Sequence, residues 1–239
     1  MTRMLKALGL ALSLAALAAV TAPAAQAETG AVTTPVYPSI LTAQQQGGVT
    51  YDIGNGPVWG VTCNTTLDAT LVGPTDPVTF TPTFGNCAAD PGFTPVTVTT
   101  NGCDYRIGFT KPGTTGQPAT TGTMQAWINC PAGQQIEIHV YLDAFAHAAN
   151  VSTCTYDIQP QGPVPAGIYH NTPGAVPPDV DMTINARFTA TSTIGAGGAP
   201  CGGEAGTQHL PITLTGNYTL RAFNDLNGVE GGQMPVDVG

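Results

Sequence analysis

Residues 101–161 decide the fold, and they read NGCDYRIGF (101–109), GTMQAWINCPAG (122–133), QQIEIHVYL (134–142) and STCTYDIQPQ (152–161). In the third run apolar and polar residues alternate, with Ile136, Ile138 and Val140 on one face. Alternation with a period of two is typical of a strand that buries one side. Cysteines lie at the ends of these runs. The stretch therefore predicts an antiparallel meander held by disulfides.

A similar hairpin is predicted further upstream. Residues 63–72 and 78–84 both alternate, and they flank the turn sequence Gly-Pro-Thr-Asp-Pro at 73–77. Glycine and proline in such a cluster favour a tight reversal of the chain. A turn centred in this segment sets Cys63 opposite Cys87, which predicts a cross-strand disulfide.

The hairpin of the opening stretch sets Cys103 opposite Cys130 by the same reasoning. By exclusion, Cys154 then pairs with Cys201. The cysteines are even in number and predict three disulfides, as in exported proteins. A competing pattern joins Cys87 to Cys103 and Cys130 to Cys154, and it is nearly as economical in loop length.

The N-terminus has the pattern of a secretory signal peptide. Arg3 and Lys6 precede an apolar run at 7–20, and small residues follow it up to Ala27. The run of about 14 residues is short of the roughly 20 that span a bilayer. We therefore expect cleavage after Ala27 and a secreted, extracellular product without membrane insertion.

Composition narrows the classes of partner and of fold. Without the leader, four Lys and Arg residues stand against fifteen Asp and Glu, a formal charge of −11. Such a chain repels nucleic acid and anionic membrane surfaces. Only 9% of residues are charged, and 36 threonines supply much of the polarity. Threonine is β-branched and suits a pleated surface, so the composition predicts an all-β protein.

The fold class expected is an antiparallel β-sandwich, with two consecutive Ig-like or jelly-roll-like units stapled by disulfides. A proline-rich segment at 159–178 suggests the junction, and residues 143–151 are compatible with one helical turn. The predicted organisation is a leader at 1–27, an extended lead-in with one edge strand at 28–47, an N-terminal sandwich at 48–161 and a C-terminal β-rich unit at 162–239. The alternative is one large sandwich at 48–239.

Four short motifs resemble a group of uncharacterised secreted, cysteine-stapled, β-rich proteins of high-GC bacteria. The motifs are Asn101-Gly102-Cys103-Asp104-Tyr105, Cys130-Pro131-Ala132-Gly133 with Ile136-x-Ile138, Cys154-Thr155-Tyr156-Asp157-Ile158-x-Pro160-Gln161, and Gly216-Asn217-Tyr218. The resemblance covers most of residues 63–238. It implies two consecutive β-rich units and no particular activity.

Few residues support nucleophilic or zinc chemistry. The serines of the mature chain, Ser39, Ser152 and Ser192, lie outside any G-x-S-x-G motif. Glu137 and His139 share the outward face of one predicted strand and resemble half a zinc site, to which His147 would be the nearest addition. Exposed polar residues on a solvent face are the favoured explanation of these side chains.

A hydrolase of polysaccharide would need two converging carboxylates, one of them protonated. Glu204 and Glu230 lie in glycine-rich loops where such a site could form, whereas Glu137 is expected on a regular strand. Sequence spacing does not bring these carboxylates together. A secreted hydrolase that uses loop carboxylates is therefore the alternative function.

One loop carries oxygen ligands suited to calcium. Asn224, Asp225, Asn227 and Glu230 surround a glycine turn, and hard cations prefer such ligands. The spacing is not that of an EF-hand loop, and Asn-Asp-x-Asn-Gly is also an ordinary turn. Apart from this calcium site, no cofactor is expected.

The two tryptophans, Trp59 and Trp127, are the candidate ligand-binding residues, because an exposed indole can stack on a sugar ring. Trp127 lies on the face of Gln125 and Asn129 if its hairpin has no bulge. Burial in the core is the commoner role of tryptophan. The function expected is a non-catalytic binding or structural role, extracellular or at the cell envelope, with a cell-wall or extracellular glycan as partner.

Overall fold

The computed structural model describes residues 28–54, 59–90, 94–112, 120–141, 144–149, 154–172, 179–194, 208–226 and 229–238. The elements in these residues are β1 (Glu28–Gly30), β2 (Val32–Thr33), β3 (Ser39–Gln45), β4 (Val49–Ile53), β5 (Trp59–Leu71), β6 (Val78–Asp90), β7 (Thr94–Thr99), β8 (Asp104–Lys111), β9 (Thr121–Asn129), β10 (Ile136–Val140), α1 (Ala144–Ala148), β11 (Cys154–Ile158), β12 (Gln161–Thr172), β13 (Asp179–Ile194), β14 (Gln208–Leu226), β15 (Val229–Met234) and β16 (Asp237–Val238). The all-β prediction is confirmed, and the short helix agrees with the single turn expected at 143–151.

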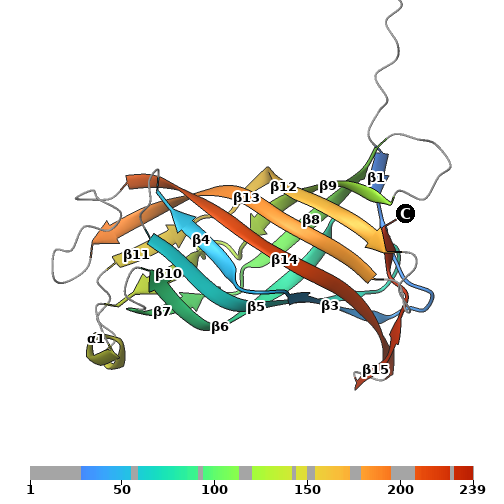
Figure 1. The fold of residues 1–239 in the computed structure, drawn as a ribbon, viewed down its shortest axis with the longest axis horizontal. Coiled ribbons are helices and arrows are strands. Elements are labelled where there is room, and N and C mark those ends of the chain that lie inside the picture. The colour runs from blue at the N-terminus through green and yellow to red at the C-terminus, as the bar shows by residue number, and fades with distance from the viewer. Residues whose placement is uncertain are drawn as a thin grey trace, which may run out of the picture.

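Four long strands, β5, β6, β13 and β14, run the length of the molecule (Figure 1). The longest pairing is between β13 and β14, from Val180 opposite Leu220 to Ser192 opposite Gln208 without a register shift. All the strand pairings are antiparallel, and they form one fourteen-stranded sheet and a small second sheet. The long strands are the frame to which the shorter strands add.

Shorter strands join the long ones into a nearly closed ring at each end. Toward one end β8, β9 and β12 connect β6 to β13, while β3 lies between β14 and β5. Toward the other end β7, β10 and β11 connect β6 to β13, while β4 lies between β14 and β5. Figure 1 shows the two sets at opposite ends of an elongated molecule. Most strand edges are thereby paired, which satisfies backbone donors and acceptors.

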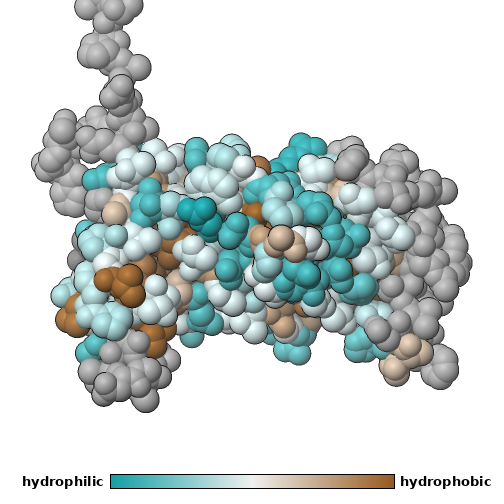
Figure 2. Space-filling view, turned by 180° about the vertical axis from the view of Figure 1, so that it is seen from behind, coloured by the Kyte–Doolittle hydropathy of each residue, from teal (hydrophilic) through white to brown (hydrophobic). Residues whose placement is uncertain are grey.

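The alternation of the strands places apolar side chains in the interior. In β10 the residues Ile136, Ile138 and Val140 are buried, as predicted, and Glu137 and His139 point outward. The largest fully buried side chains include Tyr51, Tyr156, Tyr169, Phe80 and Phe109. The outer surface seen from behind is mainly hydrophilic, and its hydrophobic residues gather mostly toward the end that carries β1 and the C-terminus (Figure 2).

Both predicted hairpin disulfides are present. Cys63 is bonded to Cys87 and Cys103 to Cys130, with sequence separations of 24 and 27 residues. The second hairpin has the predicted register throughout, since Asp104 lies opposite Asn129. The competing pairing of Cys87 with Cys103 is therefore wrong.

The third predicted bridge falls partly outside the described residues. Cys154 is disulfide-bonded, and no described cysteine is free. Its expected partner, Cys201, lies outside the described residues.

Two consecutive units are not what the strand pairing shows. β12, in the predicted second unit, lies between β9 of the first unit and β13. Likewise β14 pairs with β3 and β4. One sheet therefore draws its strands from both sides of the expected boundary at residue 161.

The proline-rich segment expected to be a junction is largely strand β12. Its pairing with β9 has register shifts between Gln161 and Val164 and between Pro165 and Gly167. Gly162 and Gly167 have positive φ values of 125° and 116°, which glycine adopts without a steric penalty. Irregular pairing of this kind accepts prolines, because their missing N–H groups fall where the ladder is interrupted.

The expected lead-in at 28–47 also belongs to the sheet. β3 lies between β14 and β5 and is not an edge strand. Leu41 and Ala43 are fully buried. Nearby, β2 pairs with β16, so that residues from the start of the described chain contact its end.

Tyr169 provides a test of the packing. Its ring lies edge-on to that of Phe109, with 5.4 Å between the ring centroids. Its hydroxyl, however, is buried without a hydrogen-bond partner in the described structure. An unsatisfied buried polar group costs about 1–3 kcal/mol. We expect Tyr169→Phe to raise the free energy of unfolding in urea by about 1 kcal/mol.

The matched control for this prediction is Tyr51→Phe. The hydroxyl of Tyr51 lies 3.4 Å from that of Tyr105, so its removal leaves Tyr105 without this partner. The control should be no more stable than the wild type. A Tyr169→Phe protein less stable than the wild type would contradict the packing described.

Candidate functional site

Trp127 lies on the outer face of the sheet. In β9 its neighbours Ala126 and Ile128 are buried, whereas Trp127 is half-buried and directed outward. The β8–β9 pairing continues without a register shift on both sides of Trp127, with Arg106 opposite it. From the sequence, Trp127 could lie either in the core or on the outer face. The unbroken hairpin places it on the outer face.

Two glycines make room for the indole. A Cβ on Gly108 would lie 3.1 Å from the benzo atoms Cη2 and Cζ3 of Trp127. A Cβ on Gly162 would lie 2.9 Å from its Cδ1. The ring therefore lies over the backbone of β8 and against the bulge of β12. The Arg106 guanidinium carbon is 6.0 Å from the ring centroid, within reach of a cation–π interaction.

An open groove of about 540 Å³ lies along β9, β12 and β13. Its lining residues are Thr123, Met124, Gln125, Pro165, Gly167, Ile168 and Asn185. Gln125 is two residues from Trp127 on the same outward face. The lining combines apolar surface with hydroxyl and amide groups and contains no carboxylate. Such a surface can pack against a polar, uncharged ring and exchange hydrogen bonds with it.

The groove depends on the irregularity of β12. A Cβ on Gly167 would lie 2.0 Å from the carbonyl oxygen of Thr183, so only glycine allows this close approach. The register shift between Pro165 and Gly167 leaves Ile168 on the outer face, where 44% of its surface is exposed. The sequence signal for this feature is Gly-Pro-Val-Pro-Ala-Gly at 162–167. It lies in the proline-rich segment that suggests a domain junction, but in the structure it is part of β12.

A second polar cluster lies on the outer face of β10 and β11. His139 Nε2 is 3.3 Å from Glu137 Oε2, and His139 Nδ1 is 3.2 Å from the Thr155 hydroxyl. Glu137 and Asp157 are opposite each other on the two strands. Burial is the largest cause that raises the pKa of Asp157, and the Glu137 carboxylate raises it further. The charge of His139 and a hydrogen bond with Gln135 lower this pKa in part.

This cluster does not form the zinc site considered from the sequence. His147 Nε2 lies 3.4 Å from the Thr97 hydroxyl, and its ring packs edge-on to Tyr141. Among the described residues no three His, Cys, Asp or Glu side chains are grouped to hold a metal ion.

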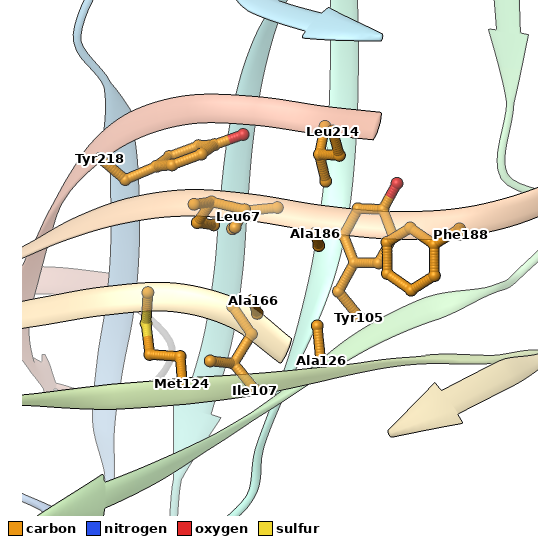
Figure 3. Close-up of a pocket in the computed structure, with 11 residues that line it drawn as sticks. Leu67, Tyr105, Ile107, Met124, Ala126, Ala166, Ala186, Phe188, Leu214 and Tyr218 are labelled. Atoms are coloured by element: carbon orange, nitrogen blue, oxygen red, sulfur yellow. The ribbon is translucent and has the colours of Figure 1, made fainter. Parts of the chain in front are cut away.

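The interior of the ring is packed and leaves little space. A cavity of about 20 Å³ lies among side chains that include Leu67, Met124, Phe188 and Tyr218 (Figure 3). This volume holds about one water molecule. Burial raises the pKa of the lining Tyr105 to about 12. Around this cavity the described interior is therefore packed core.

Several predicted site residues cannot be placed by their side chains. Trp59 begins β5, but its side chain is outside the described part, as is the whole of Glu204. In the calcium candidate Asn224 lies in β14, and Asp225 is opposite Glu230 in the β14–β15 hairpin. The side chains of Asp225 and Glu230, and all of Asn227, are outside the described residues.

No protein-family model, curated protein or solved structure matches this chain. In the described part of the chain, no helix is long and apolar enough to cross a membrane.

The raised pKa of Asp157 predicts a pH-dependent stability. The folded state binds the Asp157 proton more tightly than the unfolded state does. The free energy of unfolding therefore falls as pH rises from about 4 through the folded pKa, and above that pKa the loss is complete. Asp157→Asn should raise the melting temperature at pH 7, and the gain should disappear near pH 3.

Asp68→Asn is the control for Asp157→Asn, since Asp68 is an exposed carboxylate on β5. It should show no gain at neutral pH. A gain for Asp157→Asn that is equal at pH 3 and pH 7, or no gain at pH 7, would contradict the assigned cause.

Proposed function

We propose that this protein is a secreted, non-catalytic glycan-binding protein of the cell exterior or envelope. The observation that carries the proposal is the outward Trp127 beside a groove lined by hydroxyls, amides and apolar side chains. A sugar ring has apolar C–H faces and a rim of hydroxyls. An indole suits the faces, and groups such as those of Gln125 and Asn185 suit the hydroxyls.

The location of the protein is part of the same proposal. Disulfides such as Cys63–Cys87 and Cys103–Cys130 are typical of an oxidising compartment. The leader-like sequence at 1–27 and the resemblance to secreted β-rich proteins agree with export. A glycan of the wall or of the surroundings would be within reach of such a protein.

Rigidity of the groove favours binding. Trp127 packs against the backbone at Gly108 and Gly162. Gln161 connects β12 to β13: its side-chain amide N–H donates to the carbonyl of Thr189, and its side-chain oxygen accepts the N–H of Thr189, both at 2.8 Å. Little conformational entropy would therefore be lost when a ligand binds. A preformed outer site also explains how a protein with a packed interior could bind a polymer, which can lie along an open surface.

Trp127→Ala tests the proposal on a glycan panel. If one panel member binds the wild type, loss of the indole should weaken that binding by roughly thirtyfold, about 2 kcal/mol, as for a central tryptophan of an interface. Binding is measured by calorimetry. Because Trp127 is on the outer face, the melting temperature should change little.

Two variants serve as controls. Trp127→Phe keeps an aromatic face and should retain part of the affinity, while Thr66→Ala, on β5, should bind as the wild type does. Binding to no glycan, or equal binding by Trp127→Ala, would overturn the proposal. Release of new reducing ends from a bound polysaccharide would favour the alternative function, a hydrolase.

A further inference from the structure

A row of outward side chains crosses four neighbouring strands at one level. Thr123 of β9 is opposite Ile168 of β12, and Ile168 is opposite Thr183 of β13. Thr183 is in turn opposite Asn217 of β14. All four residues are exposed, and we call them the cross-strand row. The row begins in the groove, because Thr123 and Ile168 are two of the residues that line it.

A second row runs beside the first, two residues further along the strands. Asn185, which lines the groove on β13, is opposite Thr215 of β14, and Thr215 is opposite Thr50 of β4. Neighbouring strands are about 4.8 Å apart, so the surface from β9 to β14 is about 14 Å long. A surface of this length suits an oligosaccharide better than a single sugar.

The polar groups of the cross-strand row are available to a ligand. In the described part of the chain, the side chains of Thr123, Thr183 and Asn217 make no hydrogen bond to another protein group. One level further along β14 the situation differs, because Thr219 donates to Asp181 at 2.8 Å and accepts a hydrogen bond from Gln46. Hydroxyl and amide groups without protein partners can both donate to and accept from the hydroxyls of a sugar.

The charges around the row do not favour an acidic ligand. The lining of the groove and the cross-strand row contain only uncharged side chains. On β13 the nearest charged residues are Asp181 and Arg187, which are of opposite sign and lie one at each border. Residues 28–239 carry four Lys and Arg against fifteen Asp and Glu, so the chain as a whole repels polyanions.

We propose that the ligand of the groove is a neutral polysaccharide whose extended chain lies across the strands, from Thr123 over Ile168 to Asn217. This inference rests on the glycan-binding function proposed above. Ile168, with 44% of its surface exposed, would contact the apolar face of a sugar ring. The hydroxyls of Thr123 and Thr183 on either side of it would bond the hydroxyls at the rim of that ring.

The affinity of such a site depends on the length of the ligand. Successive sugars contact successive strands, and each further sugar adds contacts without the entropic cost of a separate association. Trp127 is four residues from Thr123 on the same face of β9. Loss of the indole and loss of the cross-strand row are therefore independent tests.

The experiment measures affinity against chain length by calorimetry with the full mature protein. The probes are the neutral oligomers of cellulose, chitin and mannan, from the disaccharide to the hexasaccharide, with hexagalacturonate as the acidic probe. In at least one neutral series the hexasaccharide should bind about tenfold more tightly than the disaccharide. Hexagalacturonate should bind more weakly than this neutral hexasaccharide.

Two variants locate the ligand on the sheet. Asn217→Ala, at the end of the row away from the groove, should weaken binding of the hexasaccharide about fivefold, as for one lost hydrogen bond, and leave binding of the disaccharide unchanged. Thr183→Ala should weaken binding of the hexasaccharide to a similar extent. Both side chains are exposed, so the melting temperatures should match that of the wild type.

Thr193→Ala is the matched control, since Thr193 is an exposed threonine on the same face of β13, about 34 Å from Thr183 along the strand. It should bind as the wild type does. Equal affinity for short and long oligomers, preference for hexagalacturonate, or unchanged binding by Asn217→Ala and Thr183→Ala would overturn the inference. Glycan binding that depends on Trp127 would then leave the proposed function intact. No binding to any neutral or acidic glycan would overturn both.

Discussion

The pairing of β13 with β14 is the constraint on which the rest of the structure depends. It extends from Val180–Leu220 to Ser192–Gln208 without a shift, and it connects the two ends of the molecule. A strand edge exposes unpaired N–H and C=O groups, so every long strand needs a partner on each side along its whole length. The shorter strands supply those partners, one set toward each end, and this requirement produces the nearly closed rings.

Closing the sheet on its apolar side leaves the polar side chains on the outer face. The interior side chains that include Leu67, Met124 and Phe188 pack around a cavity of about 20 Å³. The outer face is built from Thr, Asn and Gln residues with few charges. Strand β12 is irregular on this surface, because Gly162 and Gly167 bend the backbone where side chains would clash. The groove is a consequence of that bend.

Local pairing explains which parts of the fold could be predicted. The register of the β8–β9 hairpin and the disulfides Cys63–Cys87 and Cys103–Cys130 follow from turns and alternation within about thirty residues of chain. The buried face of β10 was evident for the same reason. In contrast, the roles predicted for the segments that form β3 and β12 were wrong, since an edge strand and a domain junction were expected there. Proline, glycine and glutamine obscure the alternation in these two segments. Their partners lie far away along the chain, as β14 does from β3.

The sequence by itself determined the class of the protein: all-β and disulfide-bonded. These properties follow from composition, alternation and short-range turns, which act within a hairpin. Only the tertiary structure decided that one sheet uses both halves of the chain and that a groove forms along β9, β12 and β13. Those relations depend on long-range strand register and on the register shifts of β12, whose positions are set by contacts between residues distant in sequence.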